Sequence, residues 1–354
     1  MLTGVIGGGE GGQTAHPQAE ELARLLIARG ADPFDRQALY NTSLGADSTF
    51  WLKLLWSESD KRGEASKWTS SPSLAGASAV DYLLGNAVPR HPHRVEWLLQ
   101  HGANTNALNA YSKEAVIKHA VVAGNQDVIE LLVRHGAKRP ELSDAEVFLS
   151  AAVQGDTATL HRLADLHPEY LQRPDAMFAV IQQRRGDIAE LLLNLGTSPN
   201  VADEKGFSAL HYTTHCGAAG IAELLIARGA DIDAIEHRYN STPLRHANYQ
   251  GRPEMVAIIA PFSRDIRGLC FAGAIDRLTE LFAADHSLAS KITRGEPPLF
   301  ALPNDDERAV DVAELLLAHG ADPTIKNPAG LTPAEAAKKR GLDEAAATIS
   351  VAEP

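Results

Sequence analysis

The octapeptide LLIARGAD occupies residues 25–32 and recurs letter for letter at residues 224–231. A third close copy, LLLAHGADP, occupies residues 315–323. The apolar residues in each copy recur at helical spacing, so one face of the helix is expected to be buried. The glycine that follows supplies the left-handed backbone on which many helices end. Each copy therefore predicts the end of an amphipathic helix.

These terminal glycines recur with a period of about 33 residues, which is typical of a repeat array. Gly102 and Gly136 are 34 residues apart, and Gly196 and Gly229 are 33 residues apart. The two identical octapeptides begin 199 residues apart, which corresponds to about six such repeats. The spacing therefore predicts an array that runs through most of the chain.

A second, shorter helix is expected ahead of each octapeptide-like phrase. It spans residues 207–214 in one repeat and 241–247 in the next. In the latter, Thr242 is a capping hydroxyl and Pro243 suits the first helical position. Each repeat is therefore predicted to consist of a turn, a short helix, a second helix and a glycine stop.

The motif within one repeat resembles that of the ankyrin-repeat proteins. Residues 203–211, DEKGFSALH, are followed by Gly217, by IAELL at 221–225 and by Gly-Ala at 229–230. This order is similar to the family pattern of a turn, T-P-L-H-x-A-A, a glycine and a second helix that ends in G-A. Residues 330–337, GLTPAEAA, are a second close match.

The resemblance to ankyrin-repeat proteins, of the bacterial type, covers almost the whole chain. It implies an all-α solenoid of stacked helix-turn-helix repeats joined by β-hairpin-like turns. We count about ten repeats, some of them degenerate. Residues 144–152 and 159–166 fit the two helices, but His167-Pro168 replaces the Gly-Ala stop, and Ala284-Asp285-His286 ends another repeat in the same way.

The expected organisation is a single array over residues 19–354 that closes with a capping repeat at 331–350. Residues 1–18 are Gly-rich and are expected to be a frayed start, in a chain that is either a shortened member of a longer array or one that begins with a frayed cap. Residues 57–78 are polar and fit no repeat, so they are predicted to form an inserted loop. Trp68 in this segment is either folded back over the repeats or exposed as an anchor.

Composition and charge limit the classes of function. The hydrophobic content of 44% can bury a core, and the formal charge of −12 disfavours nucleic acid as a partner and favours a basic protein. The two cysteines, Cys216 and Cys270, form no spaced metal motif and are compatible with a reducing compartment. No apolar run reaches membrane-spanning length, and no secretory signal is evident, so a cytoplasmic location is expected.

The sequence contains partial matches to cofactor- and metal-binding motifs, and each lacks the surrounding residues that the motif needs. GGGEGG at residues 7–12 satisfies a dinucleotide fingerprint literally, but no strand precedes it. His211, His215 and Cys216 have a spacing that metal ligands sometimes use, but the family resemblance implies that His211 bonds backbone and fixes adjacent repeats. Cys270 falls at an inward position of the motif, where a buried, inert thiol is expected. We therefore expect no catalytic residues, no cofactor and no metal.

Binding is expected on the hairpin tips and on the outward positions of the first helices, because packing does not constrain these side chains. Tyrosines and histidines gather in two neighbouring repeats, and tyrosine is enriched at protein interfaces. The candidate partner-binding residues are Asn109, Tyr111, Asp203, Glu204, Lys205, Tyr212, His215, Glu236, His237, Arg238, Tyr239, His246, Tyr249 and Asn327.

Two classes of function follow from these expectations. The first is a non-catalytic scaffold or adaptor, expected to be monomeric, that binds another protein, with a bacterial toxin-neutralising or host-directed effector protein as the alternative. The second, which has less support, is an enzyme with a site in the degenerate repeats, because an enzyme needs convergent polar residues in a pocket.

Overall fold

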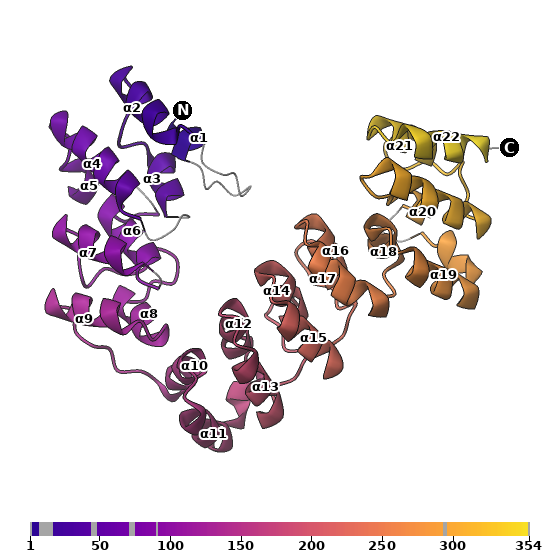
Figure 1. The fold of residues 1–354 in the computed structure, drawn as a ribbon. Coiled ribbons are helices and arrows are strands. Elements are labelled where there is room, and N and C mark those ends of the chain that lie inside the picture. The colour runs from indigo at the N-terminus through magenta and orange to yellow at the C-terminus, as the bar shows by residue number, and fades with distance from the viewer. Residues whose placement is uncertain are drawn as a thin grey trace. The chain divides into compact units, whose positions relative to one another are not determined.

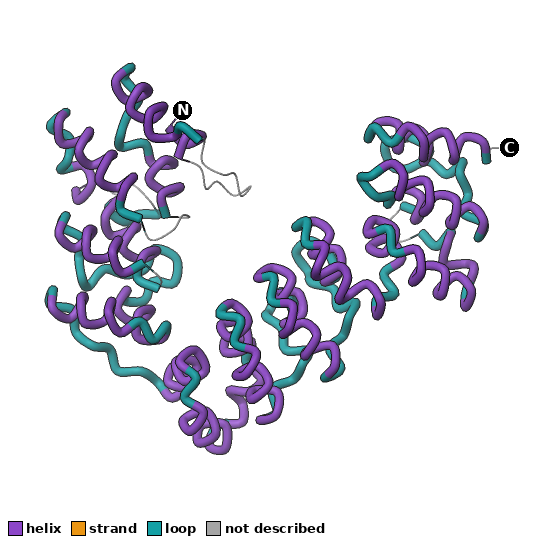
Figure 2. Tube along the Cα trace, in the orientation of Figure 1, coloured by secondary structure: helices purple, strands orange, loops and turns teal. Residues whose placement is uncertain are grey.

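The computed structural model describes residues 2–6, 17–43, 48–70, 75–89, 91–292 and 296–352. Helices and turns make up the fold (Figures 1 and 2), the described residues form no extended strand, and isolated β-bridges join Leu108 to Ala115, Ala202 to Ser208 and Glu236 to Ser241. The chain divides into two compact units, Met1–Gln154 and Gly155–Pro354, where the sequence predicts one array. Each unit is built from helical repeats, as the all-α prediction requires.

Unit 1 stacks its helices in pairs. Helix α6 packs on α7 and α8 packs on α9, while α10 lies against α8. The helices of unit 1 are α1 (Leu2–Ile6), α2 (Ala19–Ala28), α3 (Arg36–Thr42), α4 (Phe50–Lys61), α5 (Lys67–Ser70), α6 (Ala79–Ala87), α7 (Pro92–Gln100), α8 (Val116–Val122), α9 (Gln126–Arg134) and α10 (Asp144–Gln154).

Unit 2 repeats the same pairing. The first helices α12, α14, α16 and α18 stack in a row, and each packs on the second helix of its own repeat. The helices of unit 2 are α11 (Thr157–Leu166), η1 (Pro168–Gln172), α12 (Pro174–Gln182), α13 (Gly186–Leu195), α14 (Ala209–Cys216), α15 (Ala219–Ala227), α16 (Pro243–Tyr249), α17 (Pro253–Ile259), η2 (Ala260–Phe262), α18 (Ile266–Ala272), α19 (Ile275–Ala284), η3 (His286–Ala289), η4 (Pro298–Phe300), α20 (Asp306–Ala318), α21 (Pro333–Lys339) and α22 (Asp343–Val351).

The predicted helix ends are confirmed. The stop glycines that follow the repeated phrase all have positive φ, from 86° at Gly320 to 113° at Gly196. Thr242 accepts a hydrogen bond from the backbone N–H of Arg245 and so caps α16. Where the glycine is missing, at His167 and Asp285, φ is −136° and −153° and a short 3₁₀ helix follows. The 3₁₀ turn thus takes the place of the left-handed stop.

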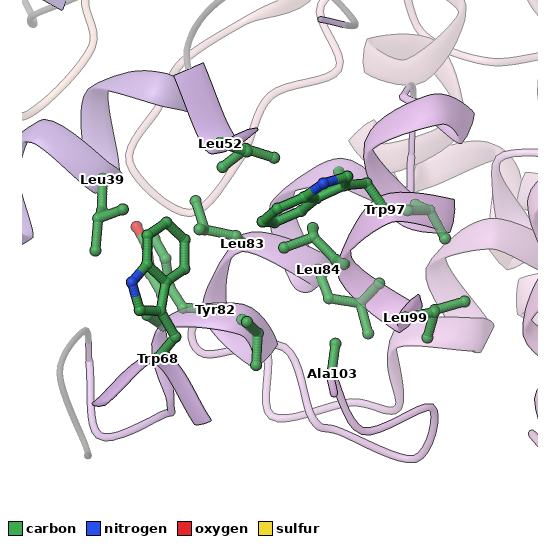
Figure 3. Packing of buried hydrophobic residues seen from close by; sticks show 14 of the residues in the cluster. Leu39, Leu52, Trp68, Tyr82, Leu83, Leu84, Trp97, Leu99 and Ala103 are labelled. Carbon is green, nitrogen blue, oxygen red and sulfur yellow. The ribbon is translucent and has the colours of Figure 1, made fainter. Parts of the chain in front are cut away.

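The segment expected as an inserted loop at 57–78 is partly helical. Residues 57–61 continue α4, and α5 covers Lys67–Ser70. Trp68 is fully buried, and its indole Nε1 donates to Ser59 Oγ at 3.1 Å. The choice that the sequence left open for Trp68 is thereby decided, because the indole folds back into the core of unit 1 (Figure 3).

Two further details of unit 1 concern α4 and α1. In α4, Phe50 is 38% exposed, while Leu52, Leu54 and Leu55 are buried. Leu2 and Ile6, in the expected frayed start, are both buried. The GGGEGG stretch of that start lies outside the described residues.

Candidate protein-binding face

The hairpin turns begin with side chains that hold their own backbone. Asp203 Oδ1 accepts hydrogen bonds from the N–H groups of Lys205 and Phe207, each at 2.9 Å. Asn109 accepts in the same way from Tyr111 and Ser112, and Asn327 from Ala329 and Leu331. These three predicted binding residues are half-buried, and they fix the turn that presents the neighbouring side chains.

The prediction that Glu236 faces outward is wrong. Its side chain is 1% exposed and accepts backbone hydrogen bonds from Arg238 at 2.7 Å, Tyr239 at 2.9 Å and Ser241 at 3.2 Å. This turn reaches its left-handed residue, Asn240, four positions after Glu236, whereas Gly206 comes three positions after Asp203. The extra methylene of glutamate spans the longer turn. Burial raises the pKa of Glu236, but the three N–H donors outweigh it and lower the pKa overall.

Beyond these turn residues, most of the predicted residues are accessible. Tyr239 is 62% exposed and Tyr249 is 92% exposed in unit 2, while Tyr111 is 65% exposed in unit 1 and its hydroxyl lies 2.6 Å from that of Tyr82. The other exposed residues of the predicted set are Glu204, Lys205, His215, His237 and Arg238. These side chains are therefore accessible from solvent.

A row of aromatic side chains extends along the predicted face, from α12 through α14 to α16. Tyr212 stacks on Phe178 with 4.6 Å between ring centroids and 13° between planes, and lies 6.0 Å from His215. The ring centroid of Phe207 lies 6.2 Å from that of Tyr212 and 5.3 Å from that of His246. The row therefore runs across α12, α14 and α16 as one rigid apolar strip with polar edges.

His246 occupies the inner edge of this row and contacts Tyr239 at 6.4 Å. Its side chain is only 12% exposed, so the prediction of an outward His246 is mostly wrong. Its Nε2 is buried without a hydrogen bond and lies 3.7 Å from Glu236 Oε1. Burial lowers the pKa of His246, although Glu236 acts in the opposite direction.

His211 joins successive repeats through hydrogen bonds to backbone groups. Its Nδ1 accepts the N–H of Ser208 at 3.2 Å, which places the ring proton on Nε2, and Nε2 then donates to the carbonyl oxygen of Ser241 at 3.0 Å. Burial is the main reason that the pKa of His211 falls to about 4. Across the described ranges, no three His, Cys, Asp or Glu side chains gather as metal ligands do.

Sequence reasoning missed two members of the row, Phe178 and Phe207. Phe178 lies in a helix without a T-P-L-H-like segment, so no motif fixed its register. Phe207 precedes the cap Ser208 and was treated only as part of the helix start. A hollow of about 780 Å³ between α17 and α19 of unit 2 is lined by none of the predicted binding residues.

Comparison with known proteins agrees with this geometry. Residues 176–267 match the family model of ankyrin repeats in three copies. This part of the chain is built from ankyrin repeats. The matched residues include α14 and α16 and thus the aromatic row. The resemblance seen in the sequence is therefore confirmed.

Several curated relatives carry the same repeats. The putative ankyrin repeat protein FPV115 of fowlpox virus is 26% identical over 221 residues, which are 56% of this chain and 40% of the relative. The mouse B-cell lymphoma 3 protein homolog is 27% identical over 47% of this chain and 32% of its own length. The putative ankyrin repeat protein YahD of Escherichia coli is 26% identical over 49% of this chain and 94% of its own length. The match therefore spans less than half of the first two relatives.

Two solved structures are also similar. An ankyrin repeat domain from Acinetobacter baumannii is 22% identical and covers 50% of this chain and 96% of its own, with a TM-score of 0.38. The ankyrin repeat protein EF0377 is 23% identical and covers 49% of this chain and 96% of its own, also with a TM-score of 0.38.

None of the helices in the described part of this chain has both the length and the hydropathy that a membrane crossing needs.

Proposed function

We propose that this ankyrin-repeat protein is a non-catalytic binding module, and that its protein partner contacts the hairpin and first-helix face of unit 2. Ankyrin repeats generally serve in protein–protein interaction. The observation that carries the specific proposal is the exposure of Tyr249 and Tyr239, at 92% and 62%, beside the aromatic row. Large, rigid and amphipathic side chains of this kind dominate binding energies at protein interfaces.

The order of the row supports this assignment. Tyr212 packs against Phe178 and Phe207. Tyr239 packs against His246, and the Arg238 guanidinium lies 5.0 Å from the centroid of the Tyr239 ring. Such side chains lose little conformational freedom when a partner binds. The acidic Glu204 and the basic Lys205 and Arg238 supply a polar rim at the hairpin tips.

The test is affinity capture from the source cell with the wild-type chain and with a Tyr239→Ala, Tyr249→Ala double variant. A partner that is retained by the wild type and lost by the double variant is the expected result. Phe262→Ala is the matched control, because Phe262 is 55% exposed but lies after the second helix α17. A partner that the double variant binds as tightly as the wild type would refute the proposed face.

We also propose that the chain is monomeric and that it resides in a reducing compartment such as the cytoplasm. The chain has two cysteines, Cys216 and Cys270, and Cys270 is buried. Burial raises the pKa of Cys270, which disfavours the reactive thiolate. Sedimentation analysis of the purified chain and fractionation of the source cell test these two points separately.

A further inference from the structure

A second hollow of unit 2 adjoins the proposed face. It has a volume of about 540 Å³ and lies between α16, α18, η4 and the C-terminal end of α21. Three aromatic side chains and three arginines line it: Tyr249, Phe271, Phe300, Arg245, Arg267 and Arg340. Because Tyr249 belongs both to this groove and to the proposed face, the two surfaces are continuous.

The three arginines differ in how their charge is balanced. Arg245 pairs with Asp265 at 2.5 Å, and Arg267 pairs with Glu296 at 2.9 Å. Within the described part of the chain, Arg340 instead bonds only neutral oxygens, those of Leu302 at 2.8 Å, Pro303 at 3.1 Å and the Asn304 side chain at 2.9 Å.

The Arg340 guanidinium is therefore the cation of the groove that is left unneutralised. Its three hydrogen bonds all come from Nη2, which leaves Nε and Nη1 without an acceptor among the described residues. This local positive charge stands in a chain whose net formal charge is −12. The groove thus presents an apolar wall beside a cation that still has donors to offer.

We propose that this groove binds a segment of the protein partner in which an acidic side chain lies next to an apolar or aromatic one. The carboxylate accepts hydrogen bonds from Arg340, and the neighbouring side chain packs on Phe271, Phe300 and Tyr249. Charge-assisted hydrogen bonds of this kind are about twice as strong as neutral ones. The inference rests on the proposed protein-binding function. It predicts an acidic segment in the partner, whereas the net charge of the chain favours a basic partner.

The experiment is selection of binders to the full chain from a display library of random linear peptides, followed by fluorescence anisotropy with a synthetic copy of an enriched peptide. We expect enrichment of Asp or Glu beside Leu, Ile or Phe. Arg340→Glu should weaken binding by about tenfold or more, because it removes a hydrogen-bonded charge and adds a repulsive one. Arg340→Lys keeps the charge and should retain part of the affinity.

Lys339→Glu is the matched control, since it makes the same change of charge one residue away on an exposed side chain outside the groove. Its effect should remain within about twofold at physiological salt. Circular dichroism of each variant shows whether the helices are intact.

Enrichment of Lys and Arg, a failure to recover any binder, or an acidic peptide that binds Arg340→Glu as tightly as the wild type would each overturn the inference. Peptides that lose affinity in Tyr239→Ala but not in Arg340→Glu would overturn it and still support the proposed function, because Tyr239 does not line the groove.

Discussion

The imidazole of His211 joins two successive repeats by donating from Nε2 to the carbonyl oxygen of Ser241, at 3.0 Å. The same ring accepts the N–H of Ser208 on Nδ1, and only the neutral ring can accept this hydrogen bond. The ring is fully buried. Protonation of His211 therefore opposes folding at this junction.

The stability of unit 2 should fall as the pH falls below 6.5. The pKa of His211 is about 4 in the folded chain, against an ordinary value of 6.5. Above pH 6.5 neither state binds the proton, and between pH 6.5 and 4 the unfolded chain binds it first. The free energy of unfolding should thus drop by up to about 3 kcal/mol over this range. Urea unfolding followed by circular dichroism at several pH values measures it.

The control for this prediction is the pair His211→Gln and His215→Gln. The first removes the titrating group and should flatten the pH dependence, while the second changes an exposed histidine one turn further along α14 and should leave the dependence in place. An equal pH dependence in the wild type and in His211→Gln would show that other groups are responsible.

The Arg245–Asp265 pair should be worth more than the exposed ion pairs of the chain. Arg245 is 19% exposed and Asp265 is 6% exposed, and Asp265 also accepts from Thr242 Oγ1 at 2.7 Å. Arg245→Leu leaves this buried carboxylate without its cation and should cost about 3 kcal/mol. Arg228→Leu breaks the exposed pair with Glu190 and should cost about 1 kcal/mol or less. Chemical denaturation of both variants gives the comparison.

The sequence was sufficient to predict the fold because the stacking residues repeat. The glycine stops at Gly196 and Gly229 and the cap at Thr242 follow local rules that a single repeat already shows. The burial of Trp68 was not predictable, because it depends on a segment that belongs to no repeat and packs against Trp56 and Trp97 from other helices.

The predicted face was only partly accessible for a similar reason. Position in the hairpin predicts that a residue lies at a tip, but not whether its side chain turns back to the peptide N–H groups. Glu236 turns back because its turn is one residue longer, whereas Glu204 stays exposed. Tyr239, in the same hairpin as Glu236, is 62% exposed, and Tyr249 is 92% exposed. The conformation of each turn therefore determines which of its side chains are exposed, and motif offsets do not predict that conformation.

Trp68→Ala should destabilise unit 1 by about 3–5 kcal/mol, because it leaves a large cavity in a fully packed core. Tryptophan fluorescence reports unit 1 selectively, since all four tryptophans, Trp51, Trp56, Trp68 and Trp97, belong to Met1–Gln154. The fluorescence-detected midpoint in urea should shift strongly in this variant. Phe50→Ala, at a position 38% exposed, is the control and should shift it much less.

Glu236→Ala should weaken both the fold of its hairpin and partner binding. The change removes the acceptor of three backbone N–H groups, at Arg238, Tyr239 and Ser241, and should cost about 2 kcal/mol. Glu236→Gln keeps one acceptor oxygen and should cost less, while Glu204→Ala, at an exposed tip position, should change stability by about 0.5 kcal/mol or less. Denaturation measures the first effect, and affinity for the captured partner measures the second. If Glu236→Ala matches Glu204→Ala in both measurements, the buried carboxylate does not hold Tyr239 in place.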